Sequence, residues 1–201
     1  MLASISPLGE RARGNRWGWT VLVFSLAATA TGMVLGAFLG LVGSLAGGAG
    51  PAGHVRLGLL AGVAVLAGLA DLAGPGRLPT LRRQVNEDWV ARFRWWVYGA
   101  GFGVQLGAGV TTIVTTATVY AWMAAAVLGG SLAAGAVVGA AFGVARSLPF
   151  MAVAGVEGPD ELRGMIRRLT SWAPAGRLAA AWASLAVGTT LACGLSWRGW
   201  A

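Results

Sequence analysis

The sequence contains no lysine, a single cysteine and a single histidine, and each scarcity excludes a kind of chemistry. Without lysine the chain cannot form a Schiff base, including one with retinal. Cys193 cannot form a disulfide within the chain. Cys193 and His54 together supply too few ligands for a zinc site of His and Cys. The sequence also lacks a Ser/His/acid set, paired carboxylates inside an apolar run and a glycine-rich phosphate loop. We therefore expect no enzyme activity, no cofactor and no metal.

Charged residues are scarce as well. They make up 11% of the chain, against about 25% of a soluble domain. Hydrophobic residues make up 56%, and 33 residues are glycine, which is frequent in membrane helices because it lets backbones approach closely. The net charge of +8 comes from arginines in short segments between apolar runs, a distribution typical of membrane topology signals and not of a nucleic-acid surface. We expect an all-α integral membrane protein whose surroundings are the lipid bilayer and which binds no nucleic acid.

Five apolar runs are long enough to cross the hydrocarbon core, which takes about 20 helical residues. They are Trp19–Ala46, Leu57–Gly74, Trp96–Leu128, Ser131–Val156 and Leu178–Trp197. The first and third exceed one crossing, so each could tilt, project beyond the bilayer or contain a re-entrant break. We expect a single transmembrane domain over residues 1–201 with about five transmembrane helices, and six crossings remain an alternative. The first run is far longer than the h-region of a signal peptide, so we interpret it as a signal anchor.

The arginines predict an orientation. Twelve lie in the N-terminal segment and in two long connections, residues 75–95 and 157–177, whereas only Arg56 and Arg198 lie on the opposite side. The twelve are Arg11, Arg13, Arg16, Arg77, Arg82, Arg83, Arg92, Arg94, Arg163, Arg167, Arg168 and Arg177. By the positive-inside rule, we expect the N-terminus and both connections in the cytoplasm and the C-terminus outside. We expect the protein in the plasma (inner) membrane.

Each long connection also carries apolar side chains at helical spacing among charged ones. They are Leu81, Val85, Trp89 and Phe93 in the first, and Leu162, Ile166 and Leu169 in the second. This pattern predicts two cytoplasmic amphipathic helices that lie on the headgroups, with docking of a partner as the alternative.

Small residues recur every four positions along three of the apolar runs. The stripes are Gly32, Gly36, Gly40 and Ser44; Gly99, Gly103 and Gly107; and Ser131, Gly135, Gly139, Gly143 and Ser147. Such stripes favour close helix crossing. We expect them to serve packing within the chain, and a homo-oligomer formed through a remaining stripe is the alternative.

A weak repeat connects the second and fourth runs. Gly68–Asp71 aligns with Gly143–Arg146, and each is followed by a Leu-Pro pair and a basic amphipathic segment. This indicates a duplicated helix pair, with units 17–95 and 96–172 followed by a final helix at 178–197. Chance similarity between two helices rich in glycine and alanine is the alternative.

Two charged residues fall inside apolar runs, where burial costs several kcal/mol unless the charge is paired or hydrated. Asp71 and Arg146 both lie in the cytoplasmic half of the predicted topology, where an ion pair between them is feasible. Either they form part of a substrate or ion path, or they tie the second and fourth helices together, or Arg146 extends to the headgroups.

Polar side chains form a second group of candidate site residues on the third run. Gln105, Thr112 and Thr116 fall on one helical face because their spacing completes almost whole turns. They could line a polar path or supply hydrogen bonds between helices. We expect a site built from Asp71, Arg146 and this stripe, if the chain has one.

A family resemblance follows from two segments. Phe142–Pro149 and the stretch from Gly101 to Thr116 resemble the transmembrane family of cytochrome c biogenesis and thiol–disulfide interchange proteins, which belongs with the amino-acid exporter superfamily. That resemblance implies a small helical bundle with repeated halves that moves reducing equivalents or small solutes. The redox members carry a cysteine in each repeat, whereas this chain has only Cys193, which excludes thiol exchange within the chain.

Two functions compete on this basis. The first is a transporter-like protein that moves a small solute or ion through a polar path near Arg146. The second is a non-catalytic membrane subunit, anchor or assembly factor of a larger complex, which the small-residue stripes and the amphipathic connections favour.

Overall fold

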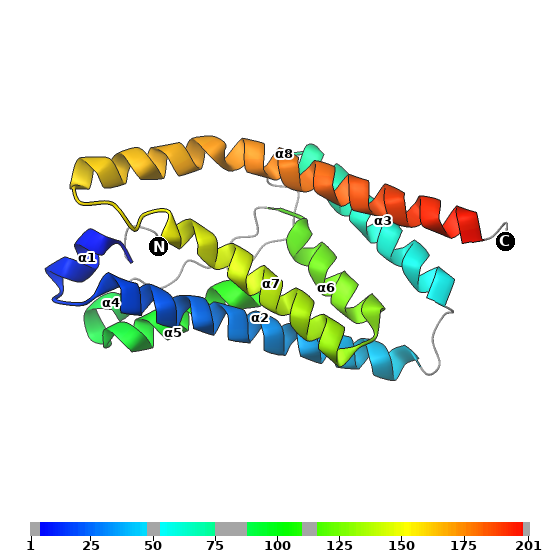
Figure 1. Cartoon of the computed structure of the whole chain (residues 1–201), viewed down its shortest axis with the longest axis horizontal. Coiled ribbons are helices and arrows are strands. Elements are labelled where there is room, and N and C mark those ends of the chain that lie inside the picture. Colours follow the sequence, from blue (N-terminus) through cyan, green and yellow to red (C-terminus); the bar gives the residue numbers. More distant parts are fainter. Residues whose placement is uncertain (1–4, 48–52, 75–87, 110–115, 199–201) are drawn as a thin grey trace.

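The structure is a computed structural model of the 201-residue chain, and it describes residues 5–47, 53–74, 88–109 and 116–198. Every regular element in these ranges is a helix (Figure 1). The helices are α1 Pro7–Ala12, α2 Trp17–Gly47, α3 Gly53–Leu72, α4 Asp88–Arg92, α5 Trp95–Ala108, α6 Thr118–Gly129, α7 Leu132–Met151 and α8 Pro159–Arg198. The helices confirm the expectation of an all-α membrane protein.

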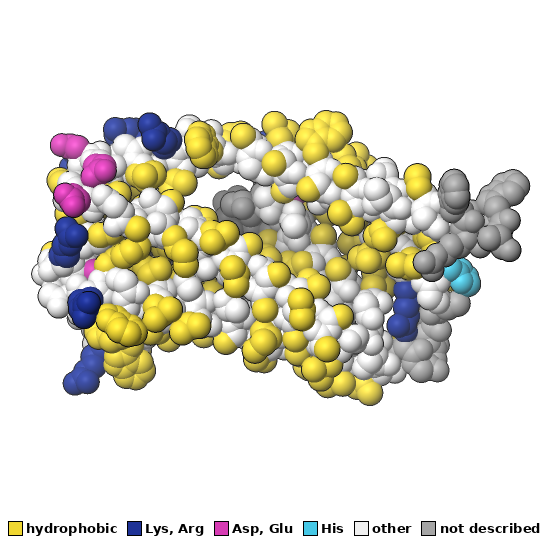
Figure 2. Space-filling model, in the orientation of Figure 1, with side chains coloured by type: hydrophobic (Ala, Val, Ile, Leu, Met, Phe, Trp, Pro, Cys, Tyr) yellow, Lys and Arg dark blue, Asp and Glu magenta, His cyan; other side chains and the backbone are white. Residues whose placement is uncertain are grey.

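Four of the described helices are long and apolar enough to cross a membrane. Their apolar spans are Trp17–Ala46, Gly53–Leu72, Leu132–Met151 and Pro159–Leu195. Figure 2 shows that acidic side chains and arginines gather at the end formed by α1 and the start of α8, while hydrophobic side chains cover the length of the molecule. An apolar length suits the hydrocarbon core of a bilayer, and a charged end suits its headgroups.

The small-residue stripes of α2 and α7 pack directly against each other. A Cβ atom added to Gly36 would overlap the carbonyl oxygen of Gly135, and one added to Gly139 would overlap that of Gly32. Since residue numbers rise along one helix as they fall along the other, α2 and α7 are antiparallel. This confirms that these stripes serve packing within the chain, at a separation that only glycine permits.

The stripe of Gly99, Gly103 and Gly107 packs against the first half of α2. Gly103 lies against the backbone of Phe24, and Gly107 lies against that of Ala28. The numbers rise together, so α5 runs parallel to α2. Further along α2, Gly43 lies against the backbone of Val127 in α6. Helices α5 and α6 therefore follow α2 in the same direction, one after the other, where the sequence predicts one run from Trp96 to Leu128.

A second antiparallel pair consists of α3 and α8. Gly68 of α3 lies against Ala181 and Leu185 of α8, and Gly188 of α8 lies against Val65 of α3. Helix α8 has 40 residues and continues through Pro174, so it is about 60 Å long at 1.5 Å per residue. The hydrocarbon core is about 30 Å thick, so α8 extends well beyond one crossing.

The continuous α8 corrects the expectation of an amphipathic helix separate from a final helix. The reason lies in the junction, where Gly176 is helical and no residue takes the positive φ that would end the helix. For the first long connection, Leu81 and Val85 lie outside the described residues. Its end forms α4, whose Trp89 ring stacks on Phe102 at 6.4 Å between centroids.

Candidate functional site

The most unusual backbone in the bundle is the interruption between α5 and α6. Helix α5 ends at Ala108, and Gly109 follows with φ +73°. The positive φ favours glycine there, and a Cβ atom at Gly109 would lie 3.1 Å from the ring of Phe142, which leaves a side chain little room. Residues 110–115 lie outside the described residues, and α6 begins at Thr118. Helix ends inside a membrane protein leave carbonyl and amide groups that need partners from elsewhere.

Arg146 of α7 supplies one of these partners. Its half-buried guanidinium donates a hydrogen bond to the carbonyl oxygen of Gly109 at 3.4 Å, and it lies over the Phe142 ring at 5.5 Å from the centroid. Phe142 in turn stacks on Trp122 of α6 at 4.7 Å. A cation at the C-terminal end of α5 interacts favourably with the negative end of the helix dipole. Arg146 thus stabilises the end of α5 and is connected by stacked rings to α6.

Asp71 of α3 supplies the partner on the other side of the interruption. It is 1% exposed, and its Oδ1 accepts a hydrogen bond from the backbone N–H of Ala117 at 2.6 Å. Ala117 is the N-cap residue of α6 and has no side chain that can cap the helix. A carboxylate at this position replaces the missing cap and complements the positive end of the helix dipole. Asp71 thus stabilises the start of α6 from a neighbouring helix.

The other site residues predicted from sequence lie around the same place. The structure shows no ion pair between Asp71 and Arg146, although it describes both residues; each bonds the backbone on its own side of the interruption. Gln105 lies half-buried in α5, and Thr116 lies half-buried just before α6, where its carbonyl oxygen accepts from Val119 N–H at 3.3 Å. Thr112 lies outside the described residues. Whether these residues form a path stays a prediction.

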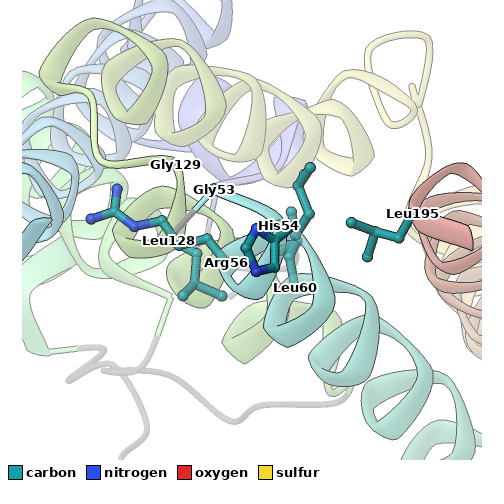
Figure 3. A pocket seen from close by; sticks show the side chains of 8 residues that line it. Gly53, His54, Arg56, Leu60, Leu128, Gly129 and Leu195 are labelled. Atoms are coloured by element: carbon teal, nitrogen blue, oxygen red, sulfur yellow. The ribbon is translucent and has the colours of Figure 1, made fainter. Parts of the chain in front are cut away.

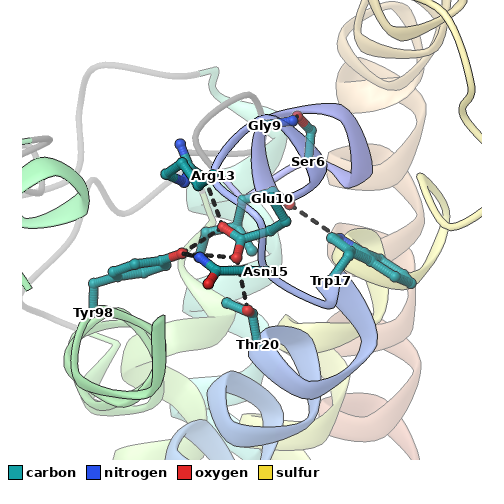
Figure 4. A network of polar contacts seen from close by, with 9 residues as sticks. Ser6, Gly9, Glu10, Arg13, Asn15, Trp17, Thr20 and Tyr98 are labelled. Carbon is teal, nitrogen blue, oxygen red and sulfur yellow. Dashed lines mark hydrogen bonds and ion pairs between the residues drawn. The ribbon is translucent and has the colours of Figure 1, made fainter. Parts of the chain in front are cut away.

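A polar cluster that sequence reasoning missed lies near the N-terminus (Figure 4). Glu10 of α1 is fully buried. Its carboxylate accepts from the Tyr98 hydroxyl at 2.6 and 2.7 Å and from the Thr20 hydroxyl at 2.9 Å. It also forms an ion pair with Arg13 at 2.6 Å. Partial burial lowers the pKa of Arg13, but the hydrogen bond and charge of Glu10 outweigh this and raise the pKa above its ordinary value. The cluster attaches α1 to α2 and α5.

A local signal for α1 was present in the sequence. Ser6 caps the helix by accepting from the Gly9 N–H at 3.1 Å, and Pro7 occupies the first turn. A serine followed by proline is a typical start of a helix. That signal predicts a helix but not its buried carboxylate, because Glu10 and Tyr98 are 88 positions apart.

Within the described residues, no group of three His, Cys, Asp or Glu side chains could hold a metal ion.

The chain is similar to proteins that carry the name methylamine utilization protein MauF. The protein from Paracoccus versutus is 36% identical over 154 residues, which cover 73% of this chain and 56% of the relative. The protein from Methylorubrum extorquens is 35% identical over 153 residues, covering 74% and 52%. The protein from Paracoccus denitrificans is 34% identical over 202 residues, covering 96% and 69%. The chain therefore spans about half to two thirds of the length of these relatives.

No protein-family model matches the chain, and no solved structure shows significant similarity to it. The relatives are of a different family from the cytochrome c biogenesis proteins and the amino-acid exporters. The resemblance drawn from Phe142–Pro149 and from the stretch between Gly101 and Thr116 is therefore wrong. Its physical cause is plain, because short phrases of glycine, alanine and valine recur wherever membrane helices pack closely.

Proposed function

Because the chain belongs to the family of the methylamine utilization protein MauF, we propose that it is a non-catalytic membrane component of methylamine utilization, acting as a subunit or assembly factor for other proteins of that process. The observation that carries this proposal is the similarity to the Paracoccus denitrificans protein, which extends over 96% of the chain. The name of the relatives refers to use of methylamine, which is the process that this proposal assigns to the chain.

The placement of the two intramembrane charges supports a scaffold role. Arg146 and Asp71 each bond a helix end at the interruption. Charges that satisfy backbone groups in this way contribute to the shape of the bundle whether or not a solute passes. In this proposal the interruption gives the bundle a defined shape that partner proteins recognise.

The proposal includes a topology. Helices α5 and α6 together form one interrupted crossing, which joins the four long apolar helices to give five crossings. The N-terminus and the start of α8 then lie in the cytoplasm, and the turn between α6 and α7 lies outside, in the plasma membrane. The arginine distribution supports this orientation.

Transport of a small solute is the second candidate, and the interrupted crossing is the observation that favours it. Broken helices whose ends face each other near the middle of the membrane are used by transporters to bind substrates and ions. The name of the relatives refers to use of methylamine and does not refer to transport.

Native purification from methylamine-grown cells, followed by protein quantification, distinguishes the two candidates. We expect one or more proteins to co-purify in stoichiometric amounts with the full-length chain. We also expect proteoliposomes that contain the purified chain alone to take up labelled methylammonium no faster than empty liposomes. A lone chain that supports saturable uptake would replace the accessory role with transport.

A further inference from the structure

A cavity of about 950 Å³ lies at the end of the bundle opposite α1, between α3, α6 and α8. Figure 3 shows His54 and Arg56 near the start of α3, with Leu128 and Gly129 of α6 on one side and Leu195 of α8 on the other. A volume of this size is in the range of sites for small organic ligands. Neither the interruption between α5 and α6 nor the Glu10 cluster contributes residues to it.

The walls of the cavity are mostly apolar. Four leucines line it, one each from α6 and α8 and two from α3: Leu57, Leu60, Leu128 and Leu195. Among the described residues that line it, the ionisable ones are Arg56 and His54 and none is acidic. An apolar body with an anionic group at one end complements such a lining.

The structure makes room for Arg56. Its guanidinium lies against the turn after α6, where a Cβ atom on Gly130 would be 2.7 Å from its Nη1. Gly130 has φ +56°, so this turn favours glycine for its conformation, and the absent side chain leaves the space that the end of Arg56 occupies. Arg56 is half-buried, and within the described ranges it forms no ion pair or hydrogen bond. Its five N–H donors are therefore available to a ligand.

We propose that this cavity binds an amphipathic anion of the surrounding membrane, with its acidic head at Arg56 and its hydrocarbon chain against the four leucines. A phospholipid phosphate and a fatty-acid carboxylate share this chemistry. Arg56 and His54 lie at the start of α3, next to the apolar length of that helix, and a polar group beside an apolar wall suits a lipid headgroup and its acyl chain. His54, which is exposed, donates a further hydrogen bond to the head.

Native mass spectrometry of the full-length chain in detergent tests this proposal, with titrations of phosphatidylglycerol, palmitate and phosphatidylcholine. We expect one tightly retained molecule of phosphatidylglycerol or palmitate per chain, and weaker retention of zwitterionic phosphatidylcholine. Retention of phosphatidylglycerol alone indicates a phosphate site, and retention of palmitate alone a carboxylate site. Arg56→Gln is expected to weaken retention about tenfold, which is typical for loss of a charge-assisted hydrogen bond.

Arg167→Gln is the matched control, because it removes the same charge from an exposed position near the start of α8, at the opposite end of the molecule. It is expected to leave retention unchanged. Leu60→Trp fills the cavity without a change of charge and is expected to lower retention as well. Equal retention by Arg56→Gln and Arg167→Gln, unchanged retention by Leu60→Trp, or equal binding of phosphatidylcholine overturns the proposal.

Discussion

At the scale of single residues, Asp71 and Arg146 perform complementary tasks on the two sides of one interruption. Asp71 accepts from the N–H of Ala117, and Arg146 donates to the carbonyl of Gly109. Burying either charge in a membrane is unfavourable in free energy. Each charge, however, bonds a helix end whose backbone groups would otherwise be unpaired, which is also unfavourable. The need for both charges therefore follows from the break in the helix.

Replacement of Asp71 by alanine and by asparagine separates its acceptor from its charge. Asp71→Ala removes the cap of α6 and is expected to lower the free energy of unfolding by about 1–2 kcal/mol. Asp71→Asn keeps an oxygen that can accept from Ala117 N–H and is expected to retain most of the stability. Thermal unfolding of both variants in detergent measures this difference. An equal loss in both would show that the charge, and not the acceptor, stabilises α6.

The buried carboxylate of Glu10 allows a second prediction at this scale. Glu10→Ala leaves the Tyr98 and Thr20 hydroxyls and the Arg13 guanidinium without their acceptor. We expect a loss of roughly 3 kcal/mol, because a buried charged group with several partners is removed. Protease cleavage near the N-terminus should become faster as α1 detaches. Asp160→Asn is the control, since its ion pair with Arg163 is exposed and contributes little.

At the scale of elements, the crossing of α2 and α7 depends on glycine along both helices. Gly139→Ala adds a methyl group where the carbonyl of Gly32 lies. The helices must then separate, at an expected cost of about 1–3 kcal/mol. Gly62→Ala on α3 is the matched control, because no atom lies within 4 Å of its added Cβ; it should leave stability unchanged or raise it slightly. Denaturation in detergent compares the two, and equal effects would contradict the close crossing.

The elements also show which features could be predicted from sequence. Four long apolar helices and the packing of the three small-residue stripes depend on local composition and spacing, and the structure confirms them. The interruption was named only as one option for Trp96–Leu128, because the residues that stabilise it, Asp71 and Arg146, come from other helices. The Glu10 cluster was missed for the same reason. The duplicated helix pair and the orientation of the bundle stay predictions.

At the scale of the whole molecule, the proposed orientation places the start of α8 in the cytoplasm and the start of α3 outside. In a chain with Cys193→Ala, a single cysteine introduced by His54→Cys is expected to react with a membrane-impermeant maleimide in intact cells. A cysteine introduced by Arg163→Cys should react only after the cells are permeabilised. Both positions are exposed, so accessibility reports the side of the membrane. The reverse labelling pattern would invert the topology.

The central claim is that the chain supports methylamine utilization without moving or converting methylamine itself. The most direct test is the methylamine-consuming activity of broken cells from a strain that lacks this protein. Breaking the cells removes any need for transport, so loss of a transporter alone would leave this activity intact. We predict that the extract has lost most of the activity and that expression of the full-length chain restores it. Full activity in the extract of the deletion strain, together with poor growth of the intact cells on methylamine, would contradict the accessory role.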